Sequence, residues 1–238
     1  MTNIQGFRLF HYEIHDSTND AAKRHAREVA IEKAVFIADQ QTNGRGRSGN
    51  TWESPIGNLY MSVLMPCQVE MRHAGQFSFI AAIALHQALS PYLSEADDLR
   101  LKWPNDLLLN NKKLAGILLE SEGQGMNLSW IVIGMGVNLN SAPDYAASLN
   151  GEISPIDLAQ DILQHIHAWI DVYMDQGFGP VRAGWLERCA GLGNQIQARL
   201  PNQTKQGTFE TIDDQGCLIL NVNGKPERIT SGEIFFDI

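Results

Sequence analysis

The sequence predicts an α+β protein in two parts: a larger part with a mixed sheet flanked by helices, and a small C-terminal β-barrel. In the first 190 residues, short apolar strand patterns alternate with segments whose apolar residues recur at helical spacing. After Gly191-Leu192-Gly193, only short strand patterns separated by turns remain. A chain of 238 residues can bury a core without disulfides. We therefore expect domains over residues 1–190 and 191–238.

The first expected elements are a strand over residues 8–13 and a helix over residues 20–30. Ser17 and Asp20 resemble an N-terminal capping box at the start of that helix. A Ser-Thr pair at a helix start is usually only a cap, so the residues alone favour that role for Ser17 and Thr18.

A glycine-rich loop is expected next, because it lies between two apolar strand patterns at residues 35–38 and 59–64. The apolar residues of segment 76–89 then recur at helical spacing. From residue 99 to 103, apolar residues alternate with Arg100 and Lys102. This period of two predicts a strand with Lys102 on the face opposite the core.

Apolar runs at residues 107–109 and 114–120 flank Asn110-Asn111, a pair that tolerates positive φ. The pattern predicts a tight hairpin. A further buried strand is expected over residues 130–136.

The rest of the larger part is expected to be helical, with helices over residues 155–173 and 180–189. Pro155 suits the first turn of the longer helix. The expected strands of the C-terminal part are residues 195–200, 207–212, 217–222 and 227–229.

Composition excludes several classes of protein. Three widely spaced cysteines, Cys67, Cys189 and Cys217, form neither a zinc pattern nor a disulfide framework, so a reducing cytoplasm is expected. A formal net charge of -9 argues against general binding to DNA, RNA or anionic lipid. No apolar run approaches the roughly 20 residues that cross a bilayer, so no membrane association is expected.

The segment Gly44-Arg45-Gly46-Arg47-Ser48-Gly49 formally matches the dinucleotide pattern G-x-G-x-x-G. Residues 50–55 do not read as the helix that this pattern requires, so the Rossmann interpretation fails, and no Walker A loop exists. What remains is a flexible loop whose two arginines, Arg45 and Arg47, can contact an anion from two sides.

Lys102, Asp106 and Lys113 form a second cationic group around the expected hairpin. Each alone is more often a solvated surface charge, but together they can hold a phosphate while the carboxylate orients a metal or a cation. Gly116 allows a ligand to approach the backbone closely.

The segment Gly134-Met135-Gly136-Val137-Asn138 ends the last strand of the larger part. Its glycines permit either a ligand lying against the backbone, with Asn138 reading a ribose or base edge, or a simple strand bulge. Trp52 either closes over a ligand or only packs.

Four motifs in this order resemble biotin protein ligase: Gly-Arg-Gly-Arg-x-Gly at 44–49, Lys-Trp-Pro-Asn-Asp at 102–106, Lys-Leu-Ala-Gly at 113–116 and Gly-Met-Gly-Val-Asn at 134–138. The resemblance runs from about residue 8 to the C-terminus. It implies a catalytic domain like those of class II aminoacyl-tRNA synthetases and biotin ligases, and an SH3-like C-terminal barrel. It also implies synthesis of biotinyl-5′-adenylate from biotin and ATP with Mg²⁺, and transfer of biotin to one lysine of a biotin carboxyl carrier domain, such as that of acetyl-CoA carboxylase.

The resemblance also implies roles for particular residues. The expected catalytic residues are Arg45, Arg47, Lys102, Asp106 and Lys113. The expected biotin contacts are Ser17, Thr18, Asn19, Gln41, Gly44, Arg45, Gly46, Arg47, Lys113 and Gly116. The expected ATP or adenylate contacts are Arg47, Trp52, Lys102, Asn105 and Asn138. No protein metal site is implied.

Two departures from the family pattern stand out. Ser48 and Asn50 occupy positions where several relatives have arginine, so the loop is less cationic. No winged-helix domain precedes residue 8, so a ligase without DNA-binding repressor activity is expected. Dimerisation through the edge of the main sheet, common among relatives, stays a hypothesis.

Two alternatives to biotin ligation remain open. A lipoate-protein ligase would share the chemistry and the scaffold, although the Gly-Arg-Gly-Arg loop favours biotin. A non-catalytic biotin or adenylate sensor is disfavoured by the presence of Arg45, Arg47 and Lys113.

Overall fold

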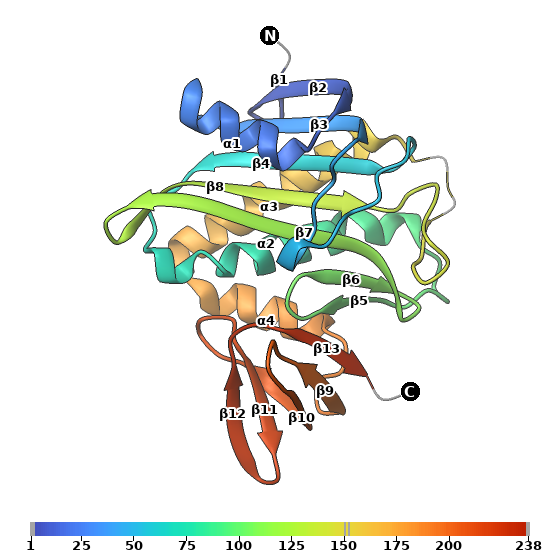
Figure 1. Ribbon diagram of the computed structural model, residues 1–238, viewed down its shortest axis with the longest axis vertical. Helices are drawn as coiled ribbons and strands as arrows, with labels where there is room; N and C mark the ends of the chain where they lie inside the picture. Colours follow the sequence, from blue (N-terminus) through green and yellow to red (C-terminus); the bar gives the residue numbers. More distant parts are fainter. Residues whose placement is uncertain (1–2, 150, 152, 237–238) are drawn as a thin grey trace.

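The computed structural model describes residues 3–149, 151 and 153–236, and its larger part is built on one mixed sheet (Figure 1). The strands of this sheet are β1 (Asn3–Ile4), β2 (Phe7–His15), β3 (Ala34–Gln41), β4 (Leu59–Pro66), β5 (Leu99–Lys102), β6 (Asp106–Leu109), β7 (Lys112–Gln124) and β8 (Asn127–Val137). Their order is β1-β2-β3-β4-β8-β7-β6-β5. Only β2 and β3 pair in parallel, because α1 connects them, and the other neighbours are antiparallel.

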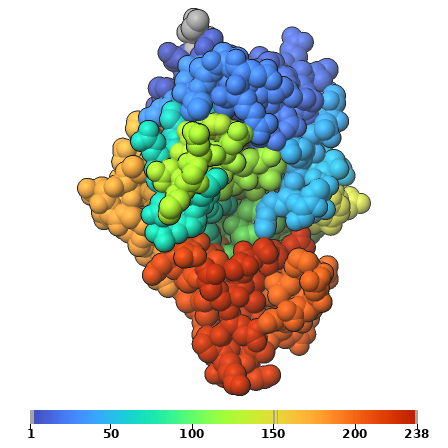
Figure 2. All heavy atoms as spheres, turned by 60° about the vertical axis from the view of Figure 1, so that its left-hand side comes forward, coloured from blue at the N-terminus to red at the C-terminus, as the bar shows by residue number. Residues whose placement is uncertain are grey.

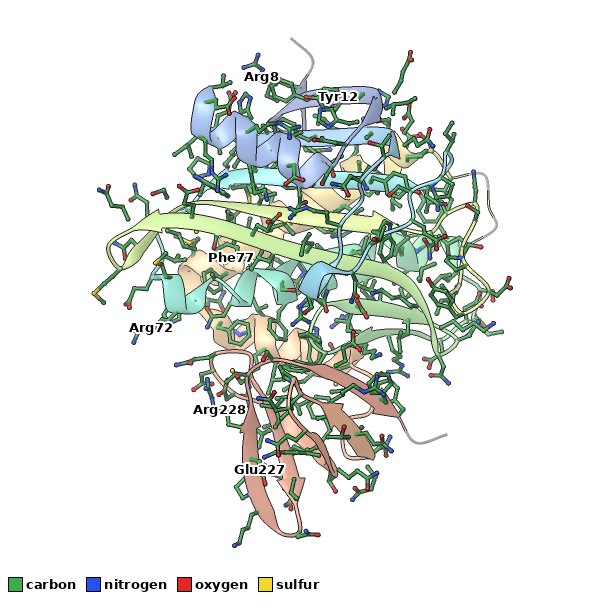
Figure 3. The ribbon with its side chains drawn as sticks, in the orientation of Figure 1. Arg8, Tyr12, Arg72, Phe77, Glu227 and Arg228 are labelled. Atoms are coloured by element: carbon green, nitrogen blue, oxygen red, sulfur yellow. The ribbon has the colours of Figure 1, made fainter. Side chains whose placement is uncertain are left out.

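The helices α1 (Thr18–Glu28), α2 (Gln76–Leu89), α3 (Pro155–Gln176) and α4 (Phe178–Arg188) bury the apolar residues of the larger part. α1 packs on one face of the sheet through a small cluster that includes Ala22, Phe36 and Trp130. The larger core lies on the other face, where the rings of Phe77 on α2 and Tyr173 on α3 are 5.3 Å apart. In Figure 3, Tyr12 lies beside α1 and Phe77 projects from α2. The predicted mixed sheet flanked by helices is confirmed.

The structure contains several of the local features that the sequence predicts. The Ser17 side chain accepts a hydrogen bond from the Asp20 backbone N–H at 3.5 Å, which confirms the helix cap. Asn110 and Asn111 both adopt positive φ, at 50° and 65°, in the β6–β7 turn. Leu101 is fully buried while Lys102 faces away from the core. Trp103, expected at the end of that strand, instead lies in the turn that follows, where its peptide bond to Pro104 is cis.

The C-terminal part is a five-stranded antiparallel sheet with the order β12-β11-β10-β9-β13. Its strands are β9 (Gln195–Arg199), β10 (Thr204–Ile212), β11 (Leu218–Val222), β12 (Lys225–Ile229) and β13 (Glu233–Phe236). Four of the five were expected, but β13 was missed because its consecutive apolar residues do not alternate with polar ones. Within the described residues, hydrogen bonds do not close the sheet into a barrel, because β12 and β13 are its two edges.

The C-terminal sheet is fixed to the larger part by side chains that bond its backbone. Trp103 Nε1 donates to the Gly216 carbonyl at 3.0 Å, and Gln76 Nε2 donates to the Asp214 carbonyl at 2.8 Å. Arg182 Nε donates to the Ile212 carbonyl at 2.5 Å. Figure 2 shows the sheet, in red, as a narrower lobe directly against the larger part.

None of the described helices combines the length and the apolar character that crossing a bilayer demands.

Candidate active site

A cavity of about 510 Å³ opens between the larger part and the C-terminal sheet. Figure 2 shows the surface hollowed where the light-blue loop segment and the red sheet approach each other over a recessed green segment. The cavity is bounded by the loop of residues 42–58 between β3 and β4, the start of α1, strands β6 to β8, and β13. The sequence-predicted residues that line it are Ser17, Thr18, Asn19, Gln41, Arg45, Gly46, Arg47, Trp52, Lys102, Asn105, Asp106, Lys113 and Gly116.

One end of the cavity carries a chain of polar side chains. Ser62 Oγ donates to Thr18 Oγ1 at 2.8 Å, and Thr18 Oγ1 donates to Gln41 Oε1 at 3.2 Å. Gln41 Nε2 in turn donates to Ser54 Oγ at 2.9 Å. Ser62 is fully buried on β4, so this series of hydrogen-bonded side chains is anchored in the sheet. This end presents oriented, uncharged hydrogen-bonding groups from three separate segments.

Asn19 closes the same end and is almost fully occupied by protein partners. Its Oδ1 lies 2.5 Å from Ser62 Oγ and shares the single Ser62 hydroxyl proton with Thr18 Oγ1, and its Nδ2 donates to Glu120 Oε2 at 2.9 Å. A Cβ at position 134 would lie 2.0 Å from Asn19 Oδ1, so Gly134 provides the space for this side chain. The first glycine of the Gly-Met-Gly segment is therefore required by packing.

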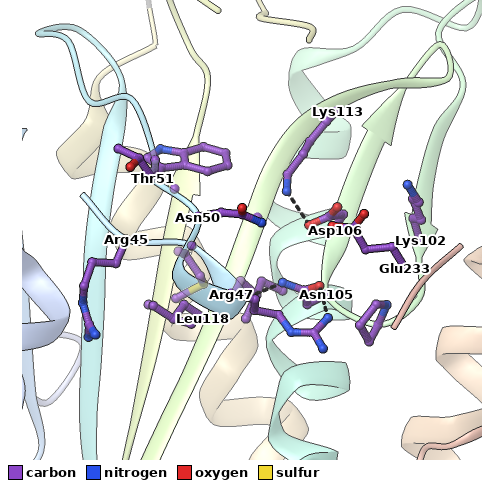
Figure 4. Close-up of a pocket in the computed structure, with 18 of the residues that line it drawn as sticks. Arg45, Arg47, Asn50, Thr51, Lys102, Asn105, Asp106, Lys113, Leu118 and Glu233 are labelled. Carbon is purple, nitrogen blue, oxygen red and sulfur yellow. Dashed lines mark hydrogen bonds and ion pairs between the residues drawn. The ribbon is translucent and has the colours of Figure 1, made fainter. Parts of the chain in front are cut away.

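Arg45 does not share a binding position with the other cations of the cavity. Its Nη2 lies 3.0 Å from Asp20 Oδ1 and also bonds Glu120 Oε2. Lys23 bridges the same two carboxylates, at 2.8 Å from Asp20 and 2.7 Å from Glu120. Figure 4 shows Arg45 directed away from the region that holds Arg47 and Lys113. Arg45 is paired with carboxylates here, and the expectation that both loop arginines meet one anion stays a prediction.

Arg47, Lys102 and Lys113 surround the other end of the cavity (Figure 4). Arg47 Nη1 donates to Asn105 Oδ1 at 3.0 Å, and Asn105 Nδ2 donates to the Ile117 carbonyl at 2.6 Å. Lys113 Nζ lies 2.7 Å from Asp106 Oδ1. Segments that are about 60 residues apart in the chain thus meet here, as the two motifs predicted.

Burial changes the ionisation of this cationic end. It lowers the pKa of Arg47, while the negative charges of Asp106 and Glu233 oppose the shift. Burial also lowers the pKa of Lys102, with Asp106 opposing and Lys113 adding to the change. Both groups are therefore poorly hydrated cations, which interact more strongly with an anion than exposed ones do.

Trp52 lies over a pair of glycines at the centre of the cavity. Gly116 on β7 and Gly136 on β8 are directly opposite each other in the sheet. A Cβ at position 136 would lie 2.5 Å from the indole, and one at position 116 would lie 3.1 Å from it. The indole Nε1 is buried and has no hydrogen-bond partner among the residues that the structure describes, so it is a donor available to a ligand. Lys113 Nζ lies 5.4 Å from the centre of the Trp52 ring.

Two predicted site residues lie outside the cavity lining. Asn138 is buried, and its Nδ2 donates to the Ala147 carbonyl at 3.1 Å, so it supports the segment that follows β8. Gly44 lies within the loop, where a Cβ would be 2.3 Å from the Trp52 carbonyl oxygen. Gly44 thus supports Trp52, whose backbone N–H donates to the Gly44 carbonyl at 3.0 Å.

The sequence prediction missed Glu120, Glu233 and Phe235. Glu233 and Phe235 line the cavity from β13, a strand that was not predicted. For Glu120, burial raises the pKa, but hydrogen bonds from Lys23 and Asn19 and the charge of Arg45 outweigh it, so the pKa lies below its usual range. The single signal for Glu120 was a carboxylate at the end of an apolar strand pattern.

Comparison with known families agrees with this geometry. The sequence profile of the Biotin/lipoate A/B protein ligase family matches residues 12–138, a range that holds all the predicted site residues. The chain belongs to this family. The Biotin protein ligase C terminal domain profile matches residues 191–237.

Relatives of this ligase family cover most of the chain. A biotin–[acetyl-CoA-carboxylase] ligase of Paracoccus denitrificans is 39% identical over 237 residues, covering 93% of this chain and 97% of its own. A biotin protein ligase structure from Leishmania major in complex with biotinyl-5-AMP has a TM-score of 0.68 and 26% identity, covering 94% of this chain and 99% of its own. A biotin protein ligase structure from Aquifex aeolicus in complex with biotin and ATP has a TM-score of 0.79 at 21% identity, covering 96% and 97%, which shows the shared fold.

Proposed function

We propose that the protein is an ATP-dependent biotin protein ligase. It activates biotin as biotinyl-5′-adenylate and transfers biotin to a lysine of a biotin carboxyl carrier domain. The observation that carries this proposal is a single cavity with neutral hydrogen-bonding groups at one end and three cations at the other. The 39% identity to a biotin–[acetyl-CoA-carboxylase] ligase over nearly the whole chain supports the same activity.

The neutral end suits the uncharged ring system of biotin. Thr18 and Gln41 present oriented oxygen and nitrogen atoms for its ureido group, and Ser17 lies beside them. Asn19 acts chiefly by fixing this wall, because its amide bonds Ser62 and Glu120. Gly46 lines the cavity beside them, and Gly116 leaves room for the Trp52 indole, which would lie 3.1 Å from a Cβ at that position.

Adenylate formation takes place at the cationic end. A carboxylate oxygen of biotin attacks the α-phosphorus of ATP, a phosphorus–oxygen bond forms, and pyrophosphate leaves. Two anions must approach each other, so the protein lowers the barrier chiefly through fixed positive charge and positioning. Lys113 contacts the reacting carboxylate and phosphate, while Arg47 and Lys102 stabilise the phosphate oxygens. Asn105 orients Arg47 from below.

Magnesium enters as part of the ATP substrate. In residues 3–149, 151 and 153–236, no three His, Cys, Asp or Glu side chains are grouped to hold a metal ion. Mg²⁺ usually keeps several water ligands and binds through substrate phosphates and one or two carboxylates. Asp106 and Glu233, which line the cavity, are the carboxylates able to meet it there.

In the second step, the lysine amine of the carrier attacks the carbonyl carbon of the adenylate, and AMP leaves. Water would hydrolyse the same mixed anhydride, so the cavity must exclude it until the carrier binds. Trp52 and the loop of residues 42–58 cover the site where the anhydride would lie.

The two parts of the chain divide this work. We place the boundary at residues 190 and 191, where α4 has ended and a Gly-Leu-Gly turn leads into β9. Residues 1–190 form the catalytic domain, and residues 191–238 form an SH3-like domain that contributes Glu233 and Phe235 to the nucleotide end. The name of the Paracoccus relative points to acetyl-CoA carboxylase as the source of the carrier domain.

Biotin-dependent exchange of labelled pyrophosphate into ATP tests the first step, and a streptavidin blot of a carrier domain after incubation with biotin and ATP tests the second. Exchange without carrier labelling would contradict the transfer step. If neither pyrophosphate exchange nor carrier labelling were found, the protein would be a binding protein without catalytic activity. The family includes lipoate ligases, so labelled biotin and lipoate should compete for transfer, with biotin strongly preferred.

A further inference from the structure

The two lysines of the cavity are held in different ways. Lys113 Nζ has a carboxylate partner, Asp106 Oδ1, at 2.7 Å. Among the side chains of residues 3–149, 151 and 153–236, no carboxylate lies within ion-pair distance of Lys102. Instead, Lys102 Nζ lies 5.3 Å from the centre of the Phe235 ring and 6.0 Å from that of Phe236. Aromatic rings of the C-terminal sheet thus take the place of a counter-ion.

The strand β13 fixes the Phe235 ring at this position. Ile234 is fully buried in the C-terminal sheet, so its neighbours Glu233 and Phe235 point the other way, into the cavity. Phe235 pairs with Gln197 of β9, and the guanidinium carbon of Arg199 lies 4.4 Å from the centre of the same ring. The Phe235 ring therefore lies close to two cations, the Arg199 guanidinium and the Lys102 ammonium.

An ammonium group within about 6 Å of a ring centre is attracted by the negative face of the ring, more strongly when it is poorly solvated. Unlike a carboxylate, the ring leaves the full positive charge available to an incoming anion. An ion pair would have to be broken or shared when a phosphate binds, whereas the ring contact can persist. Charged groups that face Lys102 from other elements are Asp106 on β6, Lys113 on β7 and Glu233 on β13.

We infer that Phe235 is a positioning residue that holds Lys102 toward the phosphates of ATP, which makes the C-terminal sheet part of the nucleotide site. The inference rests on the proposed function for the identity of the anion.

The first test is Phe235→Leu, which removes the ring but keeps an apolar side chain. We expect the KM for ATP in biotin-dependent exchange to rise on the order of tenfold, the size of a desolvated cation–π contact. The dissociation constant for biotin should stay unchanged, because the neutral end of the cavity is not touched. Phe235→Tyr keeps the aromatic face and should restore the parent KM.

Two further measurements separate positioning from packing. In a Lys102→Met background, Phe235→Leu should have no further effect on the KM for ATP, since the contact is already lost. Pentafluorophenylalanine at position 235 keeps the shape of the ring and reverses its electrostatic character. It should therefore behave like Phe235→Leu while keeping the parent melting temperature.

An unchanged KM for ATP in Phe235→Leu, or an equal rise in the Lys102→Met background, would overturn the inference. So would parent-like kinetics of the fluorinated protein, which would reduce the ring to a packing role. If the proposed function itself were wrong, the parent protein would show no biotin-dependent pyrophosphate exchange. Equilibrium dialysis with labelled ATP would still compare parent and variants in that case, and an equal ATP affinity would overturn the inference.

Discussion

Lys113 and Asp106 are paired across neighbouring strands of the main sheet, with 2.7 Å between Nζ and Oδ1. The pair lies in the cavity, beside Trp52 and Lys102. A ligand carboxylate or phosphate that binds Lys113 must share it with Asp106 or displace that carboxylate. Asp106 therefore keeps Lys113 oriented before the substrates arrive.

Lys113→Ala removes a positive charge that we propose stabilises the negative charge developing in the transition state, so the rate of adenylate formation should fall by about a hundredfold or more. The rate is measured as biotin-dependent pyrophosphate exchange. Lys112→Ala, on the neighbouring exposed residue outside the cavity, should retain the parent rate. Equal exchange rates in Lys113→Ala and the parent would exclude Lys113 from the reaction.

Arg47→Gly should weaken retention of the adenylate more than its formation, because we propose that the Arg47 guanidinium binds a phosphate oxygen of the adenylate. Loss of a charge-assisted hydrogen bond, roughly 1.5–3 kcal/mol, corresponds to a dissociation rate about tenfold to a hundredfold higher. Release of labelled adenylate into a chase of unlabelled ligand measures it. An adenylate off-rate equal to that of the parent would refute this role.

Glu120→Gln should loosen the loop of residues 42–58, because Glu120 bonds both Arg45 and Lys23. We expect faster trypsin cleavage within the loop and a several-fold faster release of adenylate. Glu122→Gln is the matched control, because Glu122 lies on the same strand but pairs with the exposed Arg27 at 2.8 Å. If both variants were cleaved at the same rate, Arg45 would not anchor the loop.

Gly136→Ala should displace Trp52, since the new Cβ would lie 2.5 Å from the indole. The strain of such overpacking is about 1–3 kcal/mol, which should raise the KM for ATP about tenfold or more. A change in tryptophan fluorescence should accompany it. Gly179→Ala, on a helix with open space at its Cβ, serves as control. Parent-like fluorescence and KM in Gly136→Ala would show that the indole is not held by this glycine.

Asp16→Asn should destabilise the protein in a pH-dependent way. Hydrogen bonds from Arg24 lower the pKa of Asp16 from its ordinary 3.8 to about 2. The folded state therefore binds this proton less readily than the unfolded state, so the stabilisation is complete above about pH 4 and is lost as the pH falls toward 2. The difference in melting temperature between parent and variant should shrink over that window, and Arg24→Gln should reproduce it. A constant difference across that range would contradict the assignment.

Local signals in the sequence predicted most of the fold. The Ser17 cap, the Asn110-Asn111 turn and the spacing of α2 depend on residues near one another in the chain, so each could be read without knowing the rest. The edge strand β13 carries no such pattern, because its position is fixed by pairing with β9. Because β13 was not predicted, the two cavity residues that it carries, Glu233 and Phe235, were not predicted either.

The sequence predicted which residues line the cavity, but not which residues they bond. Arg47 and Asn105 were both expected there, and they bond each other. Arg45 was expected beside a ligand, yet its partner Glu120 is 75 residues away in the chain and gives no motif of its own. Asn138 was expected at the nucleotide because of the family resemblance, and this stays a prediction; its amide Nδ2 donates to the Ala147 carbonyl.

The hydrogen bond from the Trp103 indole to the Gly216 carbonyl makes truncation of this chain a poor way to isolate its catalytic part. Trp103 is only 2% exposed and immediately follows Lys102. A chain shortened to end at residue 190 would remove the acceptor of that indole N–H and the segment that packs against it, next to Lys102 in the cavity. Engineering of a smaller labelling enzyme should therefore change the surface of the C-terminal sheet and keep its backbone.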